Sequence, residues 1–164
     1  MRQLILIAHN VRSTHNVGSL LRTAEGLGIE KVYLTGYTPY PLRRGDDRLP
    51  HIAQKLHDQI HKTALDAETL VDWEQNHDVF TVIDRLRENG YRIAAVEQTP
   101  ASTSLPEYDV PDKLVLIVGR EVEGIEPEVL AAVDDTLEIP MYGKKESFNV
   151  VQAAAMTLYH CRFS

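Results

Sequence analysis

The 164-residue sequence predicts an α/β fold, in which a mostly parallel β-sheet carries helices on both faces. Two observations predict it. Short apolar segments alternate with helical patterns along the whole chain, and these segments are continuously apolar, as strands are when both faces of a sheet are covered. A length of 164 residues with 43% hydrophobic residues is enough for one domain with a substantial core. We therefore expect a single domain over residues 1–164.

Each predicted strand is a short apolar run. The runs are LILIA (4–8), KVYL (31–34), RIAAVE (92–97), KLVLIVG (113–119) and TLEIP (136–140). Ligands of parallel α/β sheets bind beyond the carboxyl ends of the strands. The polar residues that follow positions 8, 35, 97, 119 and 140 are therefore the candidates for a site.

Helices are predicted between these runs from their capping residues and apolar periodicity. Asn16 is the expected N-cap of a helix that ends near residue 27, and Pro127 marks the start of a short helix. Asn149 and Gln152 have the spacing of a capping box before the last helix. The segment 35–59 is the least regular and is expected to leave the sheet, with a helix starting after Pro50.

Charge is unevenly distributed along the chain. The net charge is −7, but residues 1–62 hold nine Lys/Arg against five Asp/Glu. This imbalance fits either scattered solvated charge or a basic face for a polyanion. Cys161 is the only cysteine, which excludes an intrachain disulfide. No apolar run is long enough for a membrane span or a secretory signal, so we expect no membrane partner and a cytoplasmic location.

Several common sites are disfavoured by the motifs. No glycine fingerprint of a dinucleotide site follows the first strand, and Gly119 to Gly124 lacks the Lys-Ser/Thr of a phosphate loop. Neither does a G-x-S-x-G elbow occur. His57 and His61 are spaced to share one face of a helix. No carboxylate or cysteine lies at a spacing that would complete a metal site with them or with His51. We expect no metal site.

Three polar loops remain, each with a simple structural explanation. In the first, Arg22 stands four residues from both Gly18 and Gly26, a face that allows close approach of another segment. In the second, Glu121 follows a buried strand. In the third, Ser147 and Asn149 precede the last helix. Taken singly, these residues fit helix capping and solvated charge.

Together the three loops resemble a known family. NVRSTHNVGSLLRTA (10–24), VGREVEGI (118–125) and IPMYGKKESFNVVQAAA (139–155) are similar, in this order, to the three motifs of the SpoU/TrmH branch of the SPOUT RNA methyltransferases. HKTALDAETLVDW (61–73) resembles the middle segment of that branch. The likeness covers nearly the whole chain. We therefore expect the chain to be the catalytic core of such an enzyme, without a separate RNA-binding extension.

The resemblance implies a carboxyl-terminal trefoil knot, an exception to the rule that chains avoid knots. It implies S-adenosylmethionine as cofactor, methylation of a ribose 2′-hydroxyl in tRNA or rRNA, and a homodimer in which Arg12 lies near the partner's site. Close packing of the Gly18/Gly26 face or of the alanine-rich last helix is a physical means of forming that dimer. The alternative is a catalytically inactive RNA-binding protein of the same fold.

The resemblance also assigns residues. The implied catalytic residues are Asn16, Arg22, Glu121, Ser147 and Asn149; the implied cofactor contacts are Val96, Gly119, Ile139 and Phe148, the last replacing a leucine usual in the family; the predicted RNA-binding residues are Arg12, Arg22, Arg43 and Arg44. Arginine is a poor base because its guanidinium group stays protonated in proteins. For Arg22 we therefore favour a grip on phosphate and stabilisation of the developing alkoxide over direct proton abstraction.

Overall fold

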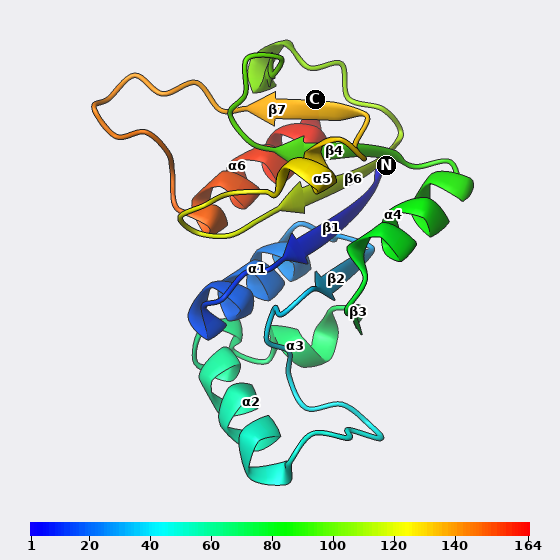
Figure 1. Cartoon of the computed structure of the whole chain (residues 1–164), viewed down its shortest axis with the longest axis vertical. Helices are drawn as coiled ribbons and strands as arrows, with labels where there is room; N and C mark the ends of the chain where they lie inside the picture. Colours follow the sequence, from blue (N-terminus) through cyan, green and yellow to red (C-terminus); the bar gives the residue numbers. More distant parts are fainter.

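The computed structural model describes residues 1–164 and contains one sheet of seven strands with helices on both faces (Figure 1). The strand order is β3-β2-β1-β6-β4-β7-β5, and every neighbouring pair is parallel. The predicted fold class is confirmed. The trefoil knot stays a prediction.

The elements follow the predicted alternation closely. The strands are β1 (Gln3–His9), β2 (Lys31–Thr35), β3 (Trp73–Asn76), β4 (Arg92–Val96), β5 (Thr103–Ser104), β6 (Lys113–Val118) and β7 (Asp135–Glu138). The helices are α1 (Thr14–Gly26), α2 (Pro50–Ala64), α3 (Ala67–Leu70), α4 (Val79–Glu88), α5 (Pro127–Leu130) and α6 (Val150–Phe163), with a short 3₁₀ turn at Leu105–Glu107. No helix has the length and apolar character needed to cross a membrane.

Two hydrophobic clusters hold the layers together. Successive side chains of a strand point to opposite faces. Leu4 and Leu6 of β1 therefore enter the cluster that the sheet forms with α1, α2, α3 and α6, whereas Ile5 and Ile7 enter the one formed with α4 and α5. Burial on both faces explains why the central strands β1 and β6 are continuously apolar over residues 4–8 and 114–118.

The start of α1 differs from the prediction. The helix begins at Thr14, and its N-cap is Ser13, whose hydroxyl accepts a hydrogen bond from the main-chain N–H of Asn16 at 3.2 Å. Asn16 as N-cap was therefore wrong, because a better-placed hydroxyl lies three residues earlier. The capping box of Asn149 and Gln152 before α6 is confirmed, as is a proline at the start of α2 and α5.

Gly18 serves the packing of α1 within the chain. A Cβ atom at this position would overlap the carbonyl of Ile60 and the hydroxyl of Thr63, both on α2, whereas one at Gly26 would meet nothing within 4 Å. The two glycines thus have different surroundings. The expected Gly18/Gly26 contact face for a partner chain is wrong at Gly18, because α2 of the same chain already occupies that face.

The end of α6 is tied to the rest of the fold by Arg162. Its guanidinium donates hydrogen bonds to the carbonyls of Leu27 (3.0 Å), Gly28 (2.8 Å) and Arg2 (2.6 Å). These carbonyls belong to the segment after α1 and to the residue before β1. The last helix is therefore anchored to the body of the fold at its carboxyl-terminal end.

Candidate active site

A pocket lies where the carboxyl ends of β4, β6 and β7 meet the first turn of α6. It is lined by 18 residues, half of them hydrophobic. The structure brings together here all four predicted cofactor contacts and two of the predicted catalytic residues: Val96, Gly119, Ile139, Phe148, Glu121 and Ser147. The ends of three strands and one helix start thus supply one concave surface, as expected for a parallel sheet.

Close packing shapes the floor of this pocket. A Cβ atom on Gly119 would lie 2.6 Å from Cγ1 of Ile125 and 3.1 Å from the Gly124 carbonyl carbon. Glycine therefore lets the loop between β6 and α5 fold directly over the end of β6. The Arg120 side chain closes the loop by donating its Nε–H to the Gly124 carbonyl at 3.0 Å.

Glu97, at the end of β4, fixes the same loop from the other side. Its carboxylate accepts hydrogen bonds from the main-chain N–H of Ile125 (3.0 Å) and of Gln98 (2.9 Å), and it lines the pocket. The sequence placed a candidate site after position 97 but did not single out Glu97. The missing information was its partner, which lies 28 residues further along the chain.

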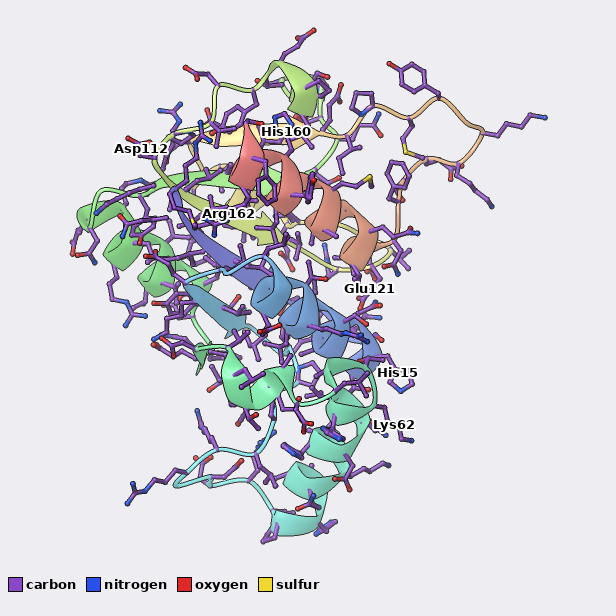
Figure 2. All side chains as sticks on the ribbon, turned by 180° about the vertical axis from the view of Figure 1, so that it is seen from behind. His15, Lys62, Asp112, Glu121, His160 and Arg162 are labelled. Atoms are coloured by element: carbon purple, nitrogen blue, oxygen red, sulfur yellow. The ribbon has the colours of Figure 1, made fainter.

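Glu121 connects the second motif to the first. Its carboxylate accepts hydrogen bonds from the main-chain N–H of Arg12 (3.2 Å) and Ser13 (3.0 Å) and from the side-chain amide of Asn16 (3.2 Å). Burial raises the pKa of Glu121, but these hydrogen bonds outweigh it, and the pKa lies below its ordinary value. Figure 2 shows Glu121 beside the first turns of α1 and α6.

A second polar network, which sequence reasoning missed, is built around Asn10, the first residue of the first motif. Asn10 has a left-handed backbone (φ 55°), which asparagine tolerates better than most residues. Its side chain donates to Glu126 at 2.7 Å and accepts from the Tyr37 N–H at 3.0 Å. His9 approaches the same carboxylate at 3.3 Å, and burial lowers the pKa of this histidine. The network joins three loops at the rim of the sheet.

Three predicted catalytic residues, Asn16, Arg22 and Asn149, stand outside the pocket of their own chain. Arg22 lines a separate hollow with Ser19, Thr23, Lys62, Thr63 and Val151. Asn149 uses its side-chain oxygen to cap α6, accepting from the Val151 N–H at 2.8 Å. Within one chain, therefore, Glu121 contacts Asn16 and shares a pocket with Ser147, whereas Arg22 lines the separate hollow between α1, α2 and α6.

Three of the four predicted RNA-binding arginines, Arg12, Arg43 and Arg44, lie on exposed loops, whereas Arg22 lies on α1. Arg12 has a 65% exposed side chain and stands 5.9 Å from the ring centroid of Tyr37, and Arg43 stands 4.9 Å from that of Tyr40. Arg44 is exposed. Arg48 differs, since its guanidinium folds inward onto Asp46 at 2.6 Å. The excursion 35–59 thus presents arginines beside aromatic rings.

His61 is paired with carboxylates. Its Nδ1 contacts the buried carboxylate of Glu68 and lies 3.8 Å from that of Asp66, so these three ligand atoms lie within 4.8 Å of one another and could hold a cation. The hydrogen bond that His61 donates to Glu68 raises the pKa of His61. A raised pKa favours the protonated form of His61, whose positive charge offsets that of the buried Glu68 carboxylate.

Comparison with known proteins agrees with the motifs. The sequence profile of the SpoU rRNA Methylase family matches residues 3–159. The tRNA (guanosine(18)-2′-O)-methyltransferase of Aquifex aeolicus is 28% identical over 98% of the chain, and the 23S rRNA (guanosine(2553)-2′-O)-methyltransferase RlmP of Bacillus subtilis is 27% identical over 96%. The chain spans 69% and 57% of the length of these two relatives.

Solved structures show the same fold. The A. aeolicus TrmH/SpoU tRNA modifying enzyme superimposes with a TM-score of 0.80 at 24% identity, over 99% of this chain and 75% of that chain. A second solved structure, from work on the 2-OH methylation of C/U34 on tRNA, superimposes with a TM-score of 0.77 at 26% identity, over 98% of this chain and 94% of that chain. The chain therefore belongs to the SpoU rRNA methylase family.

Proposed function

We propose that this chain transfers a methyl group from S-adenosylmethionine to a ribose 2′-hydroxyl of tRNA or rRNA. The observation that carries the proposal is the pocket at the ends of β4, β6 and β7, which gathers residues from the second and third motifs and is joined to the first motif through Glu121. The relatives named above are described as 2′-O-methyltransferases of tRNA and of rRNA. An RNA-modifying role also fits a cytoplasmic location.

The pocket suits the chemistry of the proposed cofactor. Val96, Ile139 and Phe148 provide apolar surface for a nucleoside, while four glutamates line the same pocket with one arginine: Glu97, Glu121, Glu138, Glu146 and Arg120. Such a lining favours a ligand that carries positive charge. When bound, S-adenosylmethionine supplies a methyl group attached to a positively charged sulfur. Gly119 keeps the end of β6 free of a side chain where the loop closes.

The residues around the pocket supply orientation and charge. A ribose hydroxyl is a weak nucleophile, so its oxygen must be aimed at the methyl carbon and its developing negative charge stabilised. Glu121 holds the start of α1 in place through three hydrogen bonds, and Ser147 stands at the pocket rim. Arg22, which lies outside this pocket, grips the phosphate adjacent to the methylated ribose, while Asn16 and Asn149 keep the first and third loops in position.

We further propose that the active site is completed in a homodimer. Tyr159 and Phe163 on α6 are 60% and 67% exposed, with ring centroids 4.7 Å apart, and Met156 lies on the same helix face. Exposed apolar groups clustered in this way favour a protein contact. The loop between β7 and α6 projects from the body (Figure 1), and its Tyr142 is 99% exposed. A second copy would cover both features and bring its Arg12 to this site.

The experiment is a methyl-transfer assay with total RNA. The protein is incubated with S-adenosylmethionine labelled in the methyl group, and the RNA is then hydrolysed with alkali. A 2′-O-methyl group blocks cleavage at its own linkage, so we expect label in alkali-resistant dinucleotides, whose sequence names the modified nucleotide. Label in ordinary mononucleotides would indicate base methylation. RNA binding without transfer would support the inactive RNA-binding protein.

A further inference from the structure

The hollow that contains Arg22 is a second feature of the catalytic face. It has a volume of about 400 Å³ and is lined by Ser19, Arg22 and Thr23 of α1, Lys62 and Thr63 of α2, and Val151 of α6. Three helices from distant parts of the sequence therefore form it. Its lining contains two cations and three hydroxyl groups but no acidic side chain.

Arg22 and Lys62 are unusual among the cations of this chain. Of the 17 Lys and Arg residues, eleven form an ion pair or hydrogen bond through their side chains, although the chain has an excess of acidic groups. Six form neither, and Arg22 and Lys62 are the pair among them that shares a hollow. Two unneutralised positive charges on one concave surface attract an anion.

The remaining lining suits a phosphate group. The hydroxyls of Ser19 and Thr23 form no hydrogen bond within the chain, so both are free to donate to phosphate oxygens, whereas Thr63 already donates to the His15 carbonyl at 2.7 Å. Val151 belongs to the first turn of the 14-residue helix α6, whose amino-terminal end carries partial positive charge. The positive charge and the free hydroxyl donors therefore favour the same ligand.

The hollow adjoins the pocket through α6. Val150 and Ala153 line the pocket, whereas Val151 lines the hollow, so the first turn of α6 separates the two cavities. Figure 2 shows Lys62 and Glu121 along the same edge of the molecule. A nucleotide with its ribose in the pocket would place a neighbouring phosphate close to the hollow.

We propose that this hollow binds a phosphate of the RNA backbone next to the methylated nucleotide, with Arg22 and Lys62 as its cationic ligands and Ser19 and Thr23 as hydrogen-bond donors. The proposal rests on the proposed function and extends it to Lys62, a substrate-positioning residue outside the three motifs. The phosphate fixes the nucleotide relative to the pocket, so loss of Lys62 acts on RNA binding before it acts on chemistry.

The test compares Lys62→Gln with Lys55→Gln. Lys55 lies two turns earlier on α2, is exposed and is outside the hollow, so both variants lose one charge from the same helix. Affinity for labelled unfractionated tRNA is measured by filter binding over a range of salt concentrations. We expect Lys62→Gln to weaken binding and to make the negative slope of log affinity against log salt concentration less steep by about 1. We expect Lys55→Gln to leave the affinity and the slope unchanged. Lys62→Arg should restore affinity.

The outcomes separate this proposal from the proposed function. Equal effects of the two glutamine variants, or no effect of either, would overturn the phosphate site even where methyl transfer is observed. A selective effect of Lys62→Gln in a protein that transfers no methyl group would support the site and contradict the activity. Thermal unfolding of each variant checks that the fold is intact. Ser19→Glu, which places a negative charge in the hollow, should weaken tRNA binding in a correctly folded protein.

Discussion

At the residue scale, the site depends on carboxylates that organise main-chain loops. Glu121 holds the loop before α1, and Glu97 holds the loop after β6. Each accepts hydrogen bonds from backbone N–H groups that would otherwise lack partners at the rim of the sheet. Hydrogen bonds to a charged group contribute about 1.5–3 kcal/mol each to stability. Glu121 and Glu97 therefore position the loops that form the rim of the pocket.

Replacing Arg22 with alanine tests its role in the reaction. The variant loses the cation that we assign to the phosphate next to the methylated ribose, so the ribose is misplaced relative to the methyl donor and turnover should fall by about 10²-fold. Affinity for S-adenosylhomocysteine should stay the same, because Arg22 does not line the cofactor pocket. Single-turnover methyl transfer and calorimetry measure the two quantities. Unchanged turnover would remove Arg22 from the mechanism.

His61 gives the fold a defined pH dependence. Its hydrogen bond with Glu68 raises the pKa of His61 above the ordinary value of 6.5, so the folded state holds the proton more tightly than the unfolded state. The resulting stability is fully present below the unfolded pKa and is lost as the pH rises through the folded pKa. We expect the free energy of unfolding to fall across this interval in the wild-type protein and less steeply in His61→Gln. Parallel pH profiles from denaturant titrations would contradict the pairing.

At the element scale, local signals predicted the buried strands and most helix starts. β1, β2, β4 and β6 are recognisable because most of their positions are apolar and buried, whereas β7 (DTLE) has one buried apolar residue, Leu137, and was predicted from the run TLEIP (136–140), which extends past the strand. β3 (WEQN) and β5 (TS) were missed, because they are short, polar strands at the edges of the sheet. Ser13 was missed as the cap of α1, since Asn16 in the same polar run is an equally good capping residue.

The packing of α1 on α2 predicts opposite effects at two glycines of one helix. Gly18→Ala should lower the free energy of unfolding by about 1–3 kcal/mol, because the new methyl group overlaps the backbone of α2. Gly26→Ala should be neutral or raise it by up to about 1 kcal/mol, because the space is open and alanine favours the helix. Equal changes in denaturant unfolding would show that α1 does not contact α2 in this way.

At the scale of the whole molecule, the sequence predicted where the site lies better than how it is held together. The rule that ligands bind beyond the carboxyl ends of parallel strands pointed to the residues after positions 97, 119 and 140, and the family resemblance assigned Val96, Gly119 and Ile139 to the cofactor; the structure brings these three residues into one pocket. The hydrogen bond between Asn10 and Glu126 joins residues 116 positions apart, and no local pattern predicts it. The position of Arg22 in a separate hollow likewise depends on α2 and α6, which pack against α1 from distant parts of the chain.

The most direct test of the central claim, that three strand ends and the start of α6 form one cofactor pocket, is calorimetric titration with S-adenosylhomocysteine. Wild-type protein should bind one molecule per chain. Ala153→Phe, which fills the pocket from the first turn of α6, should abolish binding while thermal unfolding stays cooperative. Absence of binding to the wild-type protein, or equal binding by a folded Ala153→Phe variant, would contradict the account.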